Sequence, residues 1–145
     1  MHSNHYSTCA CAADHGPEPF AADLRQAACR SDSFRTALWT GQHLQLTLMC
    51  IPAGGEIGLE MHADTDQLIR VESGSAMVQM GPCPEKPDFR QCLGPDCAVF
   101  IPAGTWHNII STGSCPLKIC SVYAPPRHPR GTVHQTKAIA DAAGD

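Results

Sequence analysis

The chain has 145 residues, a formal net charge of −4 and 17% charged residues. This length has room for one domain, because single cores typically span ~100 to 200 residues. The small negative charge excludes the basic surface of a nucleic-acid-binding protein, and the composition excludes a disordered acidic tail. Twelve glycines and twelve prolines spread along the chain indicate many turns between short elements, as in all-β domains.

The N-terminus has neither the basic start nor the apolar run of a signal peptide, and no segment approaches the ~20 apolar residues of a membrane span. The nine cysteines are odd in number and include no Cys-x-x-Cys pair. This argues against a zinc ribbon, a thioredoxin-type dithiol and a secreted disulfide scaffold. We therefore expect reduced thiols in a cytoplasmic protein that has no membrane partner.

Residues 1–32 are predicted to form a loose N-terminal arm with a possible short helix within residues 20–30. The arm is rich in metal-ligating side chains, namely His2, His5, Cys9, Cys11 and His15. Their spacing is not that of a paired metal motif, so adventitious metal binding is the interpretation that it supports.

Residues 33–124 are predicted to form a β-barrel domain. Leu44, Leu46 and Leu48 alternate with polar residues, which is the period of a half-buried strand. About eight short antiparallel strands in about ninety residues are typical of a jelly roll, and we expect them at residues 34–40, 43–51, 57–62, 67–73, 75–80, 98–101, 107–111 and 117–123. Residues 81–97 contain four prolines and are predicted to be a surface loop, because proline cannot pair within a central strand.

The last segment, residues 125–145, is predicted to be an extended C-terminal tail that begins at Pro125 and Pro126 and ends in a possible helical turn. A solvated tail is the default for such a segment, although His128, His134 and Lys137 could fold back over the barrel mouth.

The tetrad Ile-Pro-Ala-Gly occurs twice, at residues 51–54 and 101–104. Each copy leads into a segment that bears histidine. Four residues are too few to define a repeat, but they predict two equivalent turns of one architecture.

A candidate site comes from residues that these strands bring together. Glu60 and His62 are two apart on a predicted strand, so both side chains project from the same face. Gln67 opens the next strand, where hairpin pairing would place it beside His62. His107 follows the second Pro-x-Gly turn and could converge on the same interior point of a closed barrel.

These residues also have the spacing of two known motifs, and the sequence resembles small single-domain cupins of the cupin 2 type. The matching stretches are Gly54-x5-Glu60-x-His62-x4-Gln67-x6-Gly74 and Asp96-x5-Pro102-x-Gly104-x2-His107-x3-Ser111. The sequence departs from the family pattern at four positions: Glu60 replaces a histidine ligand, Gln67 a glutamate, Asp96 a glycine and Ser111 an asparagine. The tail looks like that of short bacterial cupins labelled sugar-phosphate isomerase-like, a fold analogy that is not evidence of activity.

The resemblance implies a jelly-roll barrel that holds a divalent metal ion on Glu60, His62, Gln67 and His107. Two neutral imidazoles and one carboxylate suit Fe(II), Zn(II) or Mn(II), with Gln67 as a weak fourth oxygen donor. The remaining coordination positions would be open to water or to a ligand, and anionic or polyhydroxy ligands should bind there. The alternative is that the two histidines are ordinary core residues of a barrel without a metal.

Two functions from different classes follow. The first is a metal-dependent enzyme acting on a small polar, carbohydrate-like or carboxylate substrate, either isomerase-like or Fe(II) dioxygenase-like, with Glu60 or a bound water available for proton transfer. The second is a non-catalytic module that binds or senses a small molecule through its metal. Gln45 and Tyr123 are predicted substrate-binding residues in either case, and the family resemblance implies a homodimer.

Overall fold

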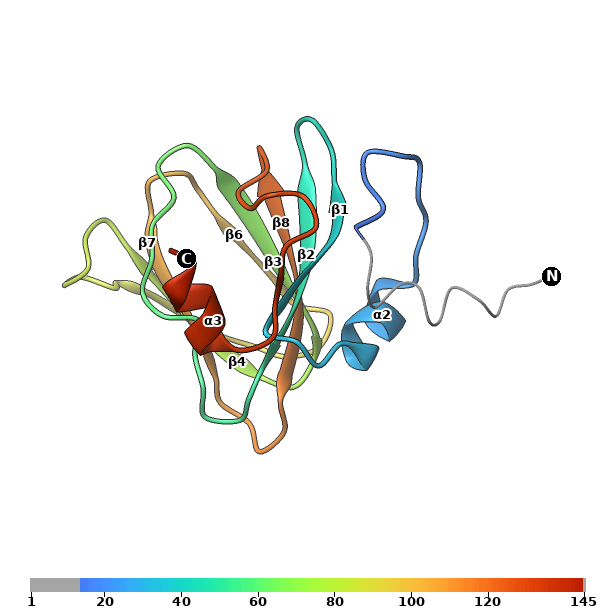
Figure 1. Cartoon of the computed structure of the whole chain (residues 1–145). Coiled ribbons are helices and arrows are strands. Elements are labelled where there is room, and N and C mark those ends of the chain that lie inside the picture. The colour runs from blue at the N-terminus through green and yellow to red at the C-terminus, as the bar shows by residue number, and fades with distance from the viewer. Residues whose placement is uncertain (1–13, 145) are drawn as a thin grey trace.

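The computed structural model describes residues 14–144, in which nine strands form two antiparallel sheets (Figure 1). The large sheet has the order β6 (Ala98–Ile101), β3 (Asp66–Ser73), β8 (Leu117–Ala124), β2 (Gln45–Ile51), β1 (Arg35–Thr40) and β9 (Val133–His134). The small sheet has the order β5 (Phe89–Leu93), β4 (Ala76–Gly81) and β7 (Trp106–Ser111). This is the jelly-roll architecture expected from the sequence.

Within residues 14–144, two short helices flank the sheets, α2 (Leu24–Arg30) and α3 (Lys137–Ala142). Ala28 of α2 packs with Leu38, Leu48 and Cys120, which are buried on the outer face of the large sheet. Ala140 of α3 belongs instead to the main core cluster. Each helix therefore covers a different part of the barrel.

The interior of the barrel is apolar at one end and polar at the other. Because side chains alternate along a strand, cross-strand partners lie on the same face. Ile119 of β8 pairs with Met49 and Val71, and all three belong to the main apolar core. Further along the same strand, Tyr123 pairs with Gln45 and Gln67 in the buried polar part of the interior. The register of β8 thus fixes where the core ends and where buried polar chemistry begins.

Two predicted elements are corrected by the structure. Residues 57–62 are not a strand, because Gly58 has φ +106 and interrupts the extended backbone. Residues 56–60 instead run beside β7 through two isolated bridges, Glu56 with Ile110 and Glu60 with His107, and a backbone hydrogen bond from Ile57 to Ile109. Conversely, β5 lies inside the predicted loop 81–97, because its five residues contain no proline and an edge strand pairs on one side only.

The tail expected to be solvated is folded onto the barrel (Figure 1). β9 pairs with β1, and His128 is only 6% exposed. The amide of Gln45 on β2 bonds the tail backbone: Nε2 donates to the carbonyl of His128, and Oε1 accepts from the N–H groups of Arg127 and His128. A buried amide with satisfied partners holds this segment in place, and a local sequence pattern does not reveal it.

The N-terminal arm is also attached to the barrel over its described part. The prediction of a loose arm is therefore corrected for the residues from Asp14 onward. The Asp14 carboxylate accepts hydrogen bonds from Thr40 Oγ1 and from the Gly131 N–H, while the Arg130 guanidinium donates to the carbonyls of Asp14 and Gly16. The histidines and cysteines at positions 2 to 11 lie outside the described residues.

The two Ile-Pro-Ala-Gly tetrads form equivalent turns, as predicted. In each, the N–H of the residue after the glycine donates to the proline carbonyl, at 2.8 Å for Gly55 and 3.2 Å for Thr105. Gly54 and Gly104 have φ +79 and +82, a region that glycine enters without steric cost. Asp96, where the motif has glycine, also adopts a left-handed φ of 71, which aspartate tolerates better than most residues.

Seven cysteines fall within the described residues, and the structure has all seven as free thiols. Arg70 lies three residues after Gln67 on β3 and so on the opposite face of the strand, where its guanidinium pairs with Asp96 at 2.7 Å. Within residues 14–144 no helix is long and apolar enough to cross a membrane.

Candidate metal centre

Glu60, His62 and His107 converge at the polar end of the barrel. A backbone bridge aligns the first with the last: the Glu60 N–H donates to the His107 carbonyl at 3.0 Å, and the His107 N–H donates to the Glu60 carbonyl at 2.9 Å. Glu60 Oε2 lies 3.6 Å from His62 Nε2 and 3.5 Å from His107 Nε2. One ligand atom from each residue falls within 4.8 Å of the others, which is a spacing that a single ion can bridge. Glu60, His62 and His107 therefore lie close together as predicted, although residues 57–62 do not form the predicted strand.

The two imidazoles are buried, and their facing nitrogens lack hydrogen-bond partners. His62 is 7% exposed and His107 is 1% exposed. Neither Nε2 atom has a partner within hydrogen-bonding distance among the described residues. Because buried polar atoms are nearly always paired, two such nitrogens beside one carboxylate are typical of a ligand site.

The other ring nitrogen of each histidine is engaged differently. His107 Nδ1 lies 2.9 Å from the Thr105 carbonyl, which can only accept, so Nδ1 carries the proton and Nε2 presents a lone pair to the site. A backbone carbonyl in this position is the usual orienting partner of a metal-bound histidine. His62 Nδ1 instead accepts from Nε of Arg127, in the folded-back tail, at 2.9 Å.

The carboxyl of Glu60 is held in its ionised form. Burial alone would raise its pKa, but interactions with His107 and His62 outweigh that effect and lower the pKa to about 2. Glu60 is therefore a carboxylate at neutral pH, which is the form in which a carboxyl group binds a metal ion.

Gln67 lies in the same polar part of the interior. It is 4% exposed, and its amide nitrogen donates to Ser121 Oγ at 2.8 Å. Its amide oxygen is buried and has no hydrogen-bond partner. Its cross-strand neighbour Tyr123 has its ring 6.1 Å from the ring of His62. The unpartnered oxygen is compatible with the weak fourth donor predicted for Gln67.

The two predicted substrate-binding residues have different surroundings. Gln45 is fully buried, and both groups of its amide are bonded to Thr40 and to the tail backbone, which argues against a role in binding substrate. The Tyr123 ring lies between His62 and His128. Burial raises the pKa of the Tyr123 hydroxyl, although the positive charge of Arg35 opposes the rise. Tyr123 thus stays neutral beside the candidate ligands.

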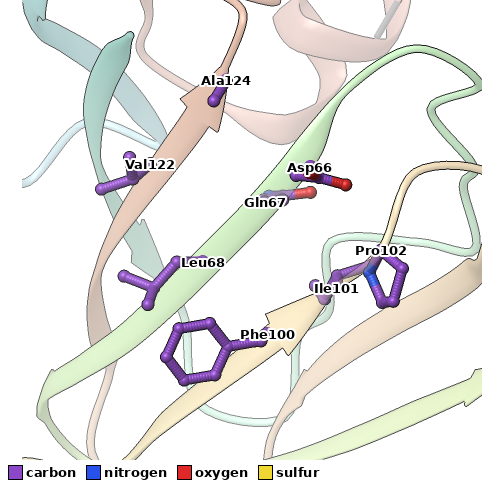
Figure 2. A pocket seen from close by; sticks show the side chains of 8 residues that line it. All are labelled: Asp66, Gln67, Leu68, Phe100, Ile101, Pro102, Val122 and Ala124. Carbon is purple, nitrogen blue, oxygen red and sulfur yellow. The ribbon is translucent and has the colours of Figure 1, made fainter.

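A separate hollow of about 370 Å³ lies on the large sheet, at β3, β6 and β8. Figure 2 shows Leu68, Phe100 and Val122 gathered there, and its polar contributors are Asp66 and Gln67. Glu60, His62 and His107 do not line it. The hollow is therefore distinct from these three residues, although Gln67, the fourth predicted ligand, contributes to its wall.

Comparison with known proteins identifies the family. Residues 47–123 match the family model described as a cupin domain. The chain belongs to the cupin family. It is 51% identical over 132 residues to the uncharacterized protein YrkC of Bacillus subtilis, covering 91% of this chain and 71% of that protein.

Solved structures share this architecture. A crystal structure from Bacillus halodurans is 54% identical with a TM-score of 0.89, covering 90% of this chain and 98% of that one. The oxalate decarboxylase of Lactobacillus farciminis shares the fold alone, at 20% identity and a TM-score of 0.55 over 61% of this chain and 26% of that one.

The donor set of this cupin fits a divalent ion. The fit rests on the buried, unpartnered nitrogens of His62 and His107 beside the ionised Glu60. Sequence reasoning missed one neighbour, Arg127. No local pattern could have revealed it, because the tail reaches the site through a fold-back that depends on the distant Gln45.

Proposed function

We propose that this cupin is a metal-dependent enzyme that acts on a small polar substrate, either carbohydrate-like or a carboxylate. The observation that carries the proposal is the convergence of Glu60, His62 and His107, with two imidazole nitrogens buried and unpaired. A bound divalent ion would supply Lewis-acid chemistry, polarising a carbonyl or hydroxyl group of the substrate.

The protein's own residues have separable roles in this proposal. His62 and His107 hold the ion, and Glu60 supplies the anionic ligand. The pKa of Glu60 is about 2, so its carboxylate is a weak base. This favours a role for Glu60 as a metal ligand over a role in proton transfer. Gln67 would add a neutral oxygen donor, so a divalent ion would keep a net positive charge that attracts an anionic substrate.

Two reaction types fit a set of two histidines and one carboxylate. An isomerase-like activity would work with several redox-inert ions, whereas a dioxygenase-like activity would require Fe(II) and consume O₂. The alternative function is a non-catalytic module that binds or senses a small molecule through the ion. Oxygen uptake and substrate turnover by the metal-loaded protein separate the three, since a binding module shows neither.

Metal analysis of variants tests the site itself. The protein is purified anaerobically and its metal content measured beside its circular dichroism spectrum, so that lost metal is not confused with lost structure. We expect one ion per chain in the wild type. Most of the metal should be lost in His62→Ala, His107→Ala and Glu60→Gln. Gln67→Ala should lose less, because water can replace a neutral amide oxygen. His43→Ala, at an exposed histidine, is the matched control and should keep its ion. If Gln67→Ala empties the site while Glu60→Gln leaves it full, the ligand assignment is wrong.

A further inference from the structure

Arg127 reaches the candidate metal centre from the tail, and its only described side-chain contact is with a candidate ligand. Its Nε donates to His62 Nδ1 at 2.9 Å. The Arg127 side chain is exposed, and no carboxylate among residues 14–144 forms an ion pair with it. A guanidinium at the edge of a buried site, with most of its donors unused, is a group that can bind an anion.

The contact of Arg127 with His62 is incompatible with ligation through the nitrogen that faces Glu60. A guanidinium has donors and no acceptor, so His62 Nδ1 must offer a lone pair to Arg127. The proton of a neutral imidazole then sits on Nε2, the atom that lies 3.6 Å from Glu60. A ligand nitrogen needs its lone pair free. His62 can therefore serve either Arg127 or an ion, and His107, bonded to a carbonyl acceptor, has no such conflict.

The backbone of Arg127 is fixed even though its side chain is exposed. The N–H groups of Arg127 and His128 donate to Oε1 of Gln45 at 3.0 and 2.9 Å, and Gln45 is fully buried. The long side chain can leave His62 while the backbone keeps the guanidinium next to the site. Gln45 is thus a positioning residue for Arg127.

We propose that Arg127 is the residue that selects a small carboxylate at the Glu60–His62–His107 site, and that it becomes free for this role when the loaded site breaks its hydrogen bond to His62. The inference rests on the proposed function and names its substrate class. The planar guanidinium matches a carboxylate in two parallel hydrogen bonds. A phosphate can accept the same pair of hydrogen bonds, but the chain has no glycine-rich loop to supply the further backbone donors that phosphate sites use.

Manganese binding, with and without an anion, tests the inference. Mn²⁺ is chosen because it prefers oxygen and imidazole donors, so the cysteines compete little for it. Free Mn²⁺ is measured by electron paramagnetic resonance in the wild type, in Arg127→Gln and in the control Arg25→Gln, which removes the same charge at an exposed position of α2. The probes are pyruvate, which is a carboxylate, and pyruvamide, its neutral amide.

Two results are expected. Without a probe, Arg127→Gln should bind Mn²⁺ roughly tenfold more tightly than the wild type, because the competing hydrogen bond and a nearby positive charge are gone. Pyruvate should tighten Mn²⁺ binding to the wild type and to Arg25→Gln by about tenfold, but to Arg127→Gln by less than about twofold. Arg127→Lys keeps the charge and should retain part of the pyruvate effect.

The inference is overturned if Arg127→Gln matches the wild type with and without pyruvate, or if pyruvamide acts as strongly as pyruvate. These outcomes differ from failure of the proposed function. If the proposed function fails, the wild type binds no Mn²⁺ at this site, and His107→Ala then leaves Mn²⁺ binding unchanged.

Discussion

The two ends of the barrel interior are built from the same strands but carry opposite chemistry. On β8, Ile119 packs with Met49 and Val71 in the apolar core. Four residues later, Tyr123 faces Gln45 and Gln67, and its ring lies near those of His62 and His128. The pairing register of β8 with β2 and β3 is therefore the same at both ends. The two ends differ in the polarity of the side chains that these strands turn inward.

The difference shows which end stabilises the fold. Burial of apolar side chains is the main favourable contribution to folding. Buried polar atoms without partners cost on the order of 1–3 kcal/mol each, and the polar end holds several, including His62 Nε2, His107 Nε2 and Gln67 Oε1. Such a cost is explained if a ligand supplies the missing partners. The apolar end thus maintains the fold, and the polar end carries the proposed ligand set.

The largest effect on stability is expected from Ile119→Ala, at the apolar end. The side chain is fully buried, so its truncation leaves a cavity and should lower the free energy of unfolding by about 2–5 kcal/mol, measured by urea denaturation. The folded variant should still bind one ion per chain, because the ligands lie at the other end. Val122→Ala, on the outward face of β8 and half-buried, is the control and should lose less stability. Equal losses would contradict the division between the ends.

A smaller effect is expected from Gln45→Ala, at the polar end. The substitution leaves the backbone groups of Arg127 and His128 without their buried partner and should destabilise the protein by about 1–3 kcal/mol. The local consequence is more specific, because the amide hydrogens of these two residues should exchange much faster with solvent. Gln42→Ala, an exposed glutamine in the turn before β2, should change neither property. Unchanged exchange at residues 127 and 128 would show that another contact holds the tail.

Much of the architecture was predictable from local patterns. The alternation in residues 43–51, the paired Ile-Pro-Ala-Gly turns and the spacing of His62 and His107 indicated a jelly roll with convergent ligands, and the structure has both. The errors fall where tertiary contacts override local signals. A positive φ at Gly58 breaks the strand expected at residues 57–62. The prolines around 81–97 concealed the short edge strand β5.

The neighbourhood of the site was less predictable than its ligands. Gln45 alternates inward like any strand residue, and nothing near it in sequence indicates that its amide holds a segment more than eighty residues away. The contact between Arg127 and His62 depends on that fold-back. Motif spacing can locate the candidate ligands, but it does not show which distant segment covers them.

Anomalous diffraction from crystals soaked in Mn²⁺ tests the central claim most directly. The account predicts one strong peak at coordination distance from Glu60 Oε2, His62 Nε2 and His107 Nε2, about 2.0–2.3 Å from each. The side chain of Arg127 should then no longer contact His62. A peak confined to the histidines and cysteines of residues 2–15, or no peak between the barrel histidines at full Mn²⁺ loading, would contradict the claim that the polar end of this cupin is a metal centre.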